Sequence, residues 1–146
     1  HINYVDDYQF ILNDSTYTVL KIIVFSEHGQ DEFAPLKTFL ATHSDLVVTS
    51  SSSNNIEINS IKAQKGLALA AYAEQKGLTM DHVMAIGDNL NDASMIKAAK
   101  YGVAMGNAIP LIKELAQKTT ATNNEDGVAD AIYWAIRLNH EEILGR

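Results

Sequence analysis

The sequence predicts an α/β protein whose second part is built around a short parallel sheet. Residues 82–87 form an apolar run that is typical of a buried parallel strand. Helical and strand-like segments alternate in short steps between residues 63 and 138, which favours parallel strands joined by helices. Residues 1–60 have a different pattern, with β-rich stretches around one helical segment, and they indicate a small α+β layer.

The elements of the N-terminal layer are predicted from branched residues and turn signals. Residues 11–12 and 18–25 are rich in branched and aromatic side chains, so both stretches are predicted as strands. Three apolar residues at helical spacing, with a proline in the first turn, predict a helix over residues 31–43. Residues 45–53 and 56–59 are predicted to pair as an antiparallel hairpin, joined by two asparagines.

The C-terminal elements follow from composition and from glycine and proline signals. An Ala- and Leu-rich segment over residues 63–75 predicts a helix, and Gly77 is a suitable residue just beyond its end. Pro110 is well placed to open a later helix. The full predicted order is helix 63–75, strand 82–87, helix 91–100, strand 101–106, helix 110–118, an extended stretch 119–122 and helix 127–138.

Composition restricts the functional classes. The 146 residues are 47% hydrophobic and carry a net charge of −7, which suits a globular protein and disfavours nucleic acid or an anionic membrane as partner. The chain has no cysteine, which excludes disulfides, thiolate metal sites and a cysteine nucleophile and fits a cytoplasmic location. No apolar run reaches the roughly 18 residues of a membrane span.

The most informative motif is Gly87-Asp88-Asn89-Leu90-Asn91-Asp92. Asp88 is predicted at the carboxyl end of a strand and Asp92 in the first turn of a helix, where ligands bind in open α/β sheets. Two carboxylates about 5 Å apart repel by roughly 3 kcal/mol at an effective dielectric constant near 20. A Mg²⁺ ion offsets that repulsion, because it prefers oxygen ligands and accepts one or two carboxylates together with a phosphate. The alternative is that Asp88 caps the helix and Asp92 is a solvated acid.

Five short segments, in this order, resemble the C-terminal half of the Cof-type subfamily of haloacid dehalogenase-like hydrolases. They are Lys65-Gly66, the motif at residues 87–92, Met95-Ile96, residues 102–108 and residues 125–129. The similarity runs from about Lys21 to Val128. Members of this subfamily are Mg²⁺-dependent phosphatases with a Rossmann-like core and an inserted α/β cap. The resemblance therefore implies an incomplete Rossmann-like parallel core sheet with helices (residues 61–146) plus part of an α+β cap (residues 1–60).

The resemblance also implies roles for four residues. Asp88 matches the metal-ligand aspartate, and Asp92 matches the second acid, which supports the metal directly or through water. Asn91 matches a position close to the transferred phosphoryl group, and Lys65 matches the lysine that neutralises the phosphate and the nucleophile. These roles agree with phosphoryl transfer, which depends on positioning and on electrostatic stabilisation. Taken alone, a lysine at a helix start is usually solvated, and Asn91 is a good helix cap.

The nucleophile of the family, in an Asp-x-Asp motif after the first strand, has no counterpart here. Asp6-Asp7 lacks the intervening residue and follows no core strand. Because the sequence starts at His1 rather than at Met, we expect it to be the C-terminal portion of a longer enzyme and to be inactive by itself. The exposed sheet edge that this implies predicts a homodimer, aggregation or association with the missing N-terminal half.

Two functional hypotheses follow. In the first, the parent protein is a phosphatase that hydrolyses small phosphorylated metabolites, such as sugar phosphates or a phosphorylated cofactor. In the second, the chain is a non-catalytic α/β module that binds a metal ion or a partner protein. An Asp-x-Asp-Gly-Thr-like segment upstream of His1 would favour the first, and a natural start at His1 would favour the second.

Overall fold

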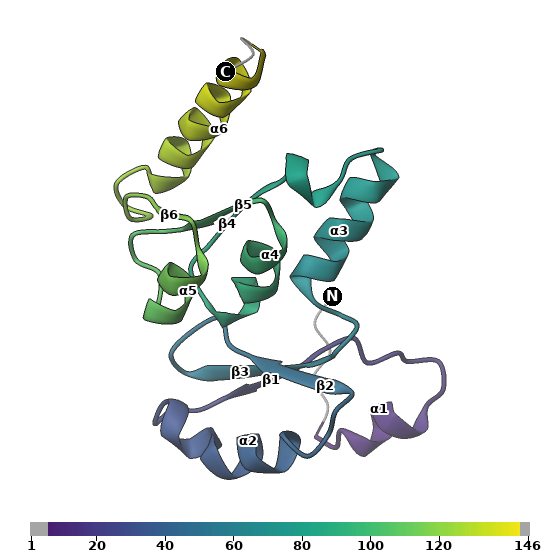
Figure 1. Cartoon of the computed structure of the whole chain (residues 1–146). Coiled ribbons are helices and arrows are strands. Elements are labelled where there is room, and N and C mark those ends of the chain that lie inside the picture. Colours follow the sequence, from purple (N-terminus) through teal and green to yellow (C-terminus); the bar gives the residue numbers. More distant parts are fainter. Residues whose placement is uncertain (1–5, 144–146) are drawn as a thin grey trace.

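The structure, a computed structural model, describes residues 6–143, so the outermost residues of both predicted domains lie outside it. It contains two three-stranded sheets. The first is antiparallel and comes from the N-terminal part of the chain, whereas the second is parallel and comes from the C-terminal part. Figure 1 shows the antiparallel sheet as a separate layer below the parallel one. The predicted α/β class with a parallel sheet is therefore confirmed.

The antiparallel layer consists of a sheet with β3 at its centre and a helix, α2, packed against it. Its elements are α1 (Gln9–Asn13), β1 (Ile22–Phe25), the 3-10 helix η1 (Gln30–Phe33), α2 (Ala34–Leu40), β2 (Leu46–Thr49) and β3 (Asn55–Ser60). The strand order is β1-β3-β2. β2 and β3 pair antiparallel, with Val48 opposite Ile58, so the predicted hairpin is confirmed.

Two strand predictions in this layer are wrong. Residues 11–12 lie in the short helix α1 and not in a strand. The strand predicted over residues 18–25 begins only at Ile22, because β3 offers partners to Ile22 through Phe25 alone. Branched residues suit a pleated, half-buried surface, but they form a strand only where another strand pairs with them.

The parallel layer alternates helices and strands as the sequence predicts. Its elements are α3 (Lys65–Gln75), η2 (Met80–His82), β4 (Met84–Gly87), η3 (Leu90–Asp92), α4 (Ala93–Ala98), β5 (Tyr101–Ala104), α5 (Pro110–Leu115), β6 (Lys118–Thr119) and α6 (Gly127–Ile143). The strand order is β4-β5-β6, with Ile86 beside Val103 and Ala104 beside Thr119. The helix predicted to end at residue 118 stops at Leu115, because Lys118 and Thr119 pair with β5. Within the described part of the chain, no helix is long and apolar enough to cross a membrane.

Helix α3 is positioned by glycines at both of its ends. Beyond its C-terminus, Gly77 has a φ of 70°, and the amides of Gly77 and Leu78 donate to the carbonyls of Glu74 and Ala73. This is the Schellman arrangement that ends many helices. At its N-terminus, the amide of Gly66 donates to Ser94 Oγ at 3.0 Å, so α3 lies directly against α4.

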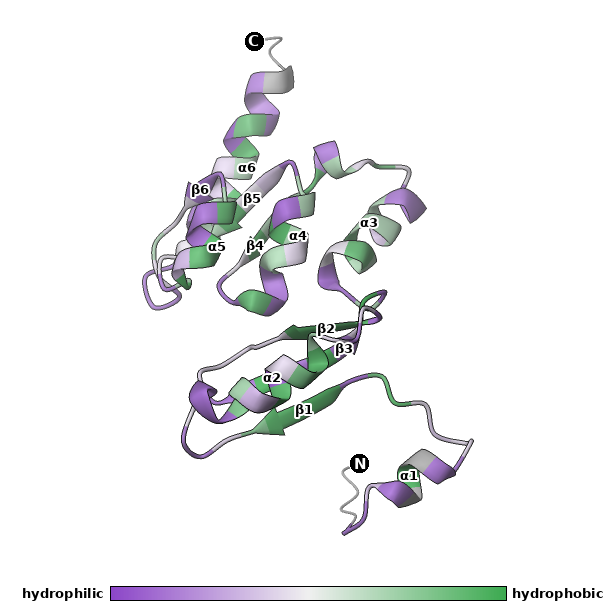
Figure 2. Ribbon diagram, turned by 60° about the horizontal axis from the view of Figure 1, so that its bottom comes forward, coloured by the Kyte–Doolittle hydropathy of each residue, from purple (hydrophilic) through white to green (hydrophobic). Residues whose placement is uncertain are grey.

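The two faces of the antiparallel sheet differ in chemistry, and both are largely covered along the central strand β3. Ile56 and Ile58 point to the apolar cluster under α2, which also contains Phe33 and Leu40. Glu57, the residue between those two isoleucines, therefore points to the opposite face, which lies toward the parallel layer. Glu57 is nevertheless only 4% exposed. Figure 2 shows β1 and β2 as hydrophobic ribbons.

The buried carboxylate of Glu57 is paired with Lys21, whose Nζ lies 2.6 Å from Glu57 Oε2. Burial by itself raises the pKa of Glu57. Hydrogen bonds from Lys21 and Ser51, together with the charges of Lys21 and Lys65, outweigh burial, so the pKa lies below its ordinary value of 4.5. Glu57 is therefore ionised near neutral pH.

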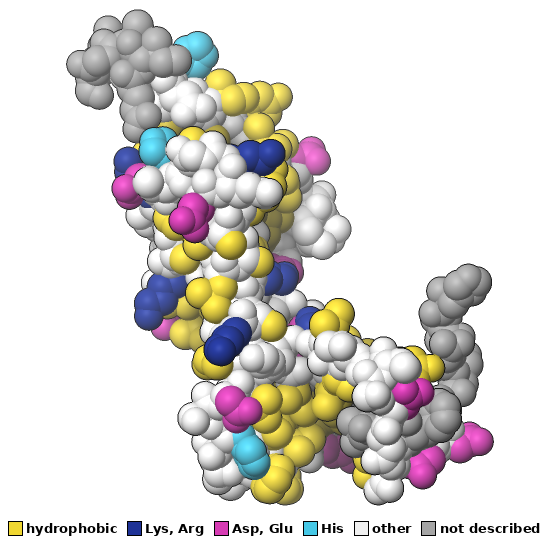
Figure 3. All heavy atoms as spheres, turned by 90° about the vertical axis from the view of Figure 1, so that its right-hand side faces the viewer, with side chains coloured by type: hydrophobic (Ala, Val, Ile, Leu, Met, Phe, Trp, Pro, Cys, Tyr) yellow, Lys and Arg dark blue, Asp and Glu magenta, His cyan; other side chains and the backbone are white. Residues whose placement is uncertain are grey.

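Among the surfaces of the described chain that expose apolar side chains, two hold four such residues each. Near the outer strand β1, Leu20, Ile22, Ile23 and Phe25 are each at least 45% exposed, and Figure 3 shows hydrophobic side chains gathered over this lower layer. On α6 the exposed apolar residues are Val128, Ile132, Tyr133 and Ile136. Contiguous apolar surface of this kind usually marks a contact with another protein segment.

Replacing Gly66 with Ala is expected to destabilise the fold. A Cβ atom at this position would lie 2.5 Å from the carbonyl oxygen of Ser94, so α3 and α4 would have to move apart. We expect Gly66→Ala to lower the free energy of unfolding by about 1–3 kcal/mol in a urea titration, despite the better helix propensity of Ala. The control Glu74→Ala changes an exposed position of the same helix and should have little effect. A Gly66→Ala chain as stable as the parent would contradict the close helix contact.

The ion pair of Glu57 predicts a specific dependence of stability on pH. Because the pKa of Glu57 is lower in the folded than in the unfolded chain, its stabilising contribution is present above pH 4.5 and is lost as the pH falls through the folded-state pKa. The melting temperature, measured between about pH 3 and pH 6, should therefore fall less steeply with acidification in Glu57→Gln than in the parent. Glu114→Gln, at an exposed position of α5, should keep the parental slope. Equal slopes in all three chains would show that the pair adds no pH-dependent stability.

Candidate active site

The centre of the candidate site is an ion pair between Lys65 and Asp92. Lys65 is the first residue of α3, and Asp92 is the last residue of η3, directly before α4. The Nζ atom of Lys65 lies 2.5 Å from Asp92 Oδ1. The Asp92 side chain is 7% exposed and that of Lys65 is 49% exposed. An ammonium group has three donors, so Lys65 keeps donors for a ligand while Asp92 holds it in place.

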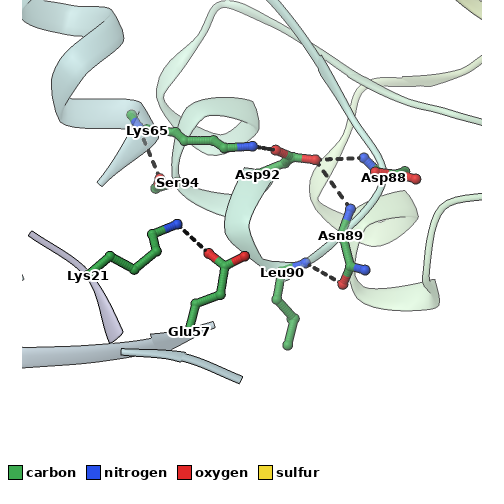
Figure 4. A network of polar contacts seen from close by, with 9 residues as sticks. Lys21, Glu57, Lys65, Asp88, Asn89, Leu90, Asp92 and Ser94 are labelled. Carbon is green, nitrogen blue, oxygen red and sulfur yellow. Dashed lines mark hydrogen bonds and ion pairs between the residues drawn. The ribbon is translucent and has the colours of Figure 1, made fainter. Parts of the chain in front are cut away.

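Asp92 also fixes the loop that carries Asp88. Its second oxygen, Oδ2, accepts hydrogen bonds from the backbone amides of Asp88 at 3.0 Å and Asn89 at 3.3 Å. Figure 4 shows Asp92 between Lys65 on one side and the backbone of Asp88 on the other. This arrangement requires a glycine at the end of β4, because a Cβ atom on Gly87 would lie 2.5 Å from Asp92 Cβ.

Asp88 follows β4 directly, at the carboxyl end of the parallel sheet, as predicted. Its side chain is exposed, and Oδ2 accepts a hydrogen bond from Asn107 Nδ2 at 3.0 Å. Asn107 Oδ1 in turn accepts from the backbone amide of Asn123 at 3.0 Å. Asn107, from the loop after β5, therefore holds Asp88, and Asn123, from the loop after β6, holds Asn107, so the carboxyl ends of all three parallel strands converge here.

The metal-binding capacity of this site is limited to a few oxygen atoms. Among the described residues, no group of three or more His, Cys, Asp or Glu side chains is placed to hold a metal ion. Asp92 already uses both oxygens in contacts with Lys65 and with backbone amides. Asp88 is exposed and offers hard oxygen atoms, which fits a Mg²⁺ ion that keeps several waters and binds one or two carboxylates and a phosphate. Direct ligation by both Asp88 and Asp92 stays a prediction.

Asn91 lies where the two layers meet. Its backbone amide donates to the carbonyl oxygen of Ser50 in the loop after β2, at 3.3 Å. Asn91 and Lys65 both line a cavity of about 200 Å³ between the antiparallel sheet and the parallel layer. Asp88 and Asp92 do not line this cavity. The structure thus brings Lys65, Asp92 and the Asp88 loop into direct contact and places Asn91 beside Lys65 on the cavity wall.

Sequence analysis did not identify the residues on the opposite wall of the cavity. They are Lys21, Val47, Thr49, Glu57 and Asn59, all from the antiparallel layer. The Oγ1 atom of Thr49 is buried without a hydrogen-bond partner among the described residues. The alternation of residues 56–59 shows that Glu57 and Asn59 share a face, but no signal in the sequence shows that a second layer covers that face.

Asp7 has a structural contact. Its Oδ1 accepts a hydrogen bond from the backbone amide of Gln9 at 2.8 Å, at the start of α1. Asp6 and Asp7 are exposed and precede α1, whereas Lys65 begins α3. That neither residue is the nucleophile stays a prediction.

Known proteins resemble this chain in sequence and in fold. A family model for haloacid dehalogenase-like hydrolases matches residues 1–132. A 5-amino-6-(5-phospho-D-ribitylamino)uracil phosphatase of Bacillus subtilis, YcsE, is 51% identical over 98 residues, which are 66% of this chain and 39% of that protein. The phosphatase YwpJ of the same organism is 49% identical over 85 residues, or 58% of this chain and 30% of that protein.

The structural neighbours agree with the sequence relatives. A haloacid dehalogenase-like hydrolase from B. subtilis superposes with a TM-score of 0.79 and 37% identity, covering 87% of this chain and 45% of that one. A sugar phosphatase of subclass IIB of the same superfamily gives a TM-score of 0.70 at 25% identity, covering 82% of this chain and 44% of that one. The chain thus spans less than half the length of these relatives. It belongs to the haloacid dehalogenase-like hydrolase family.

Proposed function

We propose that the chain is the C-terminal portion of a Mg²⁺-dependent phosphatase that hydrolyses small phosphorylated metabolites. The observation that carries the proposal is the Lys65–Asp92 pair, joined through Asp92 to the Asp88 loop at the carboxyl end of β4. The pair places a half-exposed ammonium group at the wall of a cavity of about 200 Å³. Several relatives are named phosphatases, which supports the same chemistry.

In the proposed mechanism, the residues of this chain position the phosphoryl group and neutralise its charge. Lys65 uses the donors that Asp92 leaves free to bind phosphoryl oxygens. Asn91 lies beside Lys65 on the cavity wall, and in this proposal its side-chain amide binds the same phosphoryl group. Bound next to Asp88, Mg²⁺ would supply further charge neutralisation at the phosphate oxygens. Preorganised groups of this kind account for most of the catalysis of phosphoryl transfer.

The proposal places the nucleophilic carboxylate outside these 146 residues. Two observations support a further segment at this site. The curated relatives are more than twice as long as the segments that match. Apolar side chains are exposed both near β1 and on α6. We propose that the remainder of the phosphatase covers these two surfaces and brings its carboxylate to the phosphoryl group beside Lys65.

The first test is catalytic and uses a longer protein that contains these residues. With Mg²⁺ and a generic aryl phosphate, Lys65→Ala is expected to lower kcat by at least about a hundredfold, because a donor to the transition-state charge is lost. Asp88→Asn should raise the Mg²⁺ concentration for half-maximal activity. Asp130→Asn, an exposed change on α6, should leave the kinetics unaltered. Unchanged activity in both site variants would refute the site, and a longer protein without any phosphatase activity would favour the binding-module hypothesis.

The second test uses the 146-residue chain alone. We expect it to bind Mg²⁺ weakly, because one accessible carboxylate and water provide most of the ligands. In a titration followed by NMR, the amides of Asp88 and Asn89 should shift at millimolar Mg²⁺, and Asp88→Asn should abolish the shifts. The chain alone should not hydrolyse aryl phosphates above the background rate. Turnover by the chain alone would show that the nucleophile lies within it.

A further inference from the structure

We propose that Asn107 is a positioning residue that makes Asp88 bind a cation through one carboxylate oxygen and thereby favours Mg²⁺ over Ca²⁺. The inference rests on the proposed function, in which Asp88 holds the metal ion. Asn107 Nδ2 donates to Asp88 Oδ2 at 3.0 Å, and no described residue donates a hydrogen bond to the other oxygen, Oδ1. The two oxygens of this exposed carboxylate therefore differ in what they offer to a cation.

The orientation of the Asn107 side-chain amide follows from its two neighbours. An ionised carboxylate such as that of Asp88 only accepts hydrogen bonds, and the backbone N–H of Asn123 only donates. The NH₂ group of Asn107 therefore faces Asp88, and its carbonyl oxygen faces Asn123, from which it accepts at 3.0 Å. Turning the amide over would break both hydrogen bonds. The contact with Asn123 thus keeps a donor aimed at Asp88 Oδ2.

The backbones of the two loops that carry Asn107 and Asp88 are fixed as well. The amide of Gly106 donates to the carbonyl of Ala121 at 2.9 Å. A Cβ atom on Gly106 would lie 2.8 Å from the carbonyl carbon of Ala121, so this loop lies directly against the segment after β6. The carbonyl of Asp88 accepts from the amide of Ile109 at 3.1 Å, which joins the loop after β4 to the loop after β5. The donor and the carboxylate are therefore both held in place by backbone contacts.

This arrangement suits two common divalent cations unequally. Mg²⁺ demands near-ideal octahedral geometry with short bonds and keeps several waters, so a single fixed carboxylate oxygen serves it well. Ca²⁺ takes more oxygen ligands at longer distances and readily binds a carboxylate through both oxygens. A cation that binds both oxygens of Asp88 approaches Oδ2, where the positive end of the Asn107 amide already lies. Ca²⁺ must therefore displace Asn107 or use Oδ1 alone, whereas Mg²⁺ finds its ligand already oriented.

The test compares the dissociation constants of Mg²⁺ and of Ca²⁺ for the 146-residue chain, at constant ionic strength. Binding is followed by NMR through the amide shifts of Asp88 and Asn89. In Asn107→Ala the preference for Mg²⁺, expressed as the ratio of the two constants, should fall by about tenfold, since hydrogen-bond partners of metal ligands typically contribute roughly ten- to hundredfold in affinity. Ca²⁺ should lose less than Mg²⁺, because the second oxygen of Asp88 becomes available to it.

Two further variants separate positioning of Asp88 from loosening of the loop. Asn124→Ala makes the same change at an exposed position next to Asn123 and should keep the parental ratio. Asn107→Asp keeps the shape of the side chain, removes the donor and adds a carboxylate, so it should raise the affinity for Ca²⁺ more than that for Mg²⁺. A loosened loop would weaken both cations equally. An unchanged ratio in Asn107→Ala would therefore overturn the inference.

Kinetics of a longer protein that contains these residues provide a second readout. Asn107→Ala should raise the Mg²⁺ concentration for half-maximal activity and keep kcat at saturating Mg²⁺ near the parental value, because Asn107 acts through Asp88. A loss of kcat that excess Mg²⁺ does not restore would overturn the positioning role.

The binding data also distinguish failure of this inference from failure of the proposed function. Amide shifts that Asp88→Asn abolishes, with the same Mg²⁺ to Ca²⁺ ratio in the parent and in Asn107→Ala, would refute the inference alone. If neither cation produces shifts that depend on Asp88, the metal site of the proposed function is refuted together with the inference.

Discussion

The candidate site depends on the carboxylate of Asp92, which connects three parts of the fold. One oxygen holds Lys65 at the start of α3, and the other holds the backbone of Asp88 and Asn89 after β4. A buried carboxylate is stable only when such partners compensate for its lost hydration. Lys65 and the backbone donors therefore keep the charge of Asp92 inside the protein, and in return Asp92 fixes the position of both. The close packing at Gly66 and Gly87 brings these elements near enough for the contacts to form.

The antiparallel sheet completes the site because both faces of its central strand β3 are covered. Its isoleucine face packs on α2, and its polar face is turned toward the parallel layer. Polar residues on a solvated sheet face would be ordinary, but Glu57 and Asn59 are buried here. The sheet thus contributes both stability, through its apolar face, and a polar cavity wall, through the other. The hydrogen bond from Asn91 to Ser50 joins the two layers at the edge of that cavity.

Much of the fold was accessible from the sequence, because local patterns determine it. The strand before Gly87, the glycine after α3 and the hairpin around Asn54 each have a local physical cause, and each is found in the structure. The strands are shorter than predicted, because β4 begins at Met84 and not at residue 82, and β2 ends at Thr49 and not at residue 53. Residues 11–12 were assigned wrongly because branched residues adopt a strand only beside a partner. The roles of Lys65, Asp88, Asn91 and Asp92 rest on family resemblance and stay predictions. Spacing alone does not reveal that Lys65 pairs with Asp92, 27 positions along the chain. The wall formed by Thr49 and Glu57 was missed, since alternation identifies a shared face but not what covers it.

The contact between Asp88 and Asn107 gives the site an internal reporter. Asn107 binds Asp88 with its amide nitrogen and accepts the backbone amide of Asn123 with its oxygen. A ligand that draws Asp88 away would also disturb Asn107, and the amide proton of Asn123 would then exchange with solvent at a different rate. Asn123 belongs to the loop after β6 and takes no part in the Lys65–Asp92 network. Its exchange rate would therefore follow the occupancy of the site from outside the Lys65–Asp92 network.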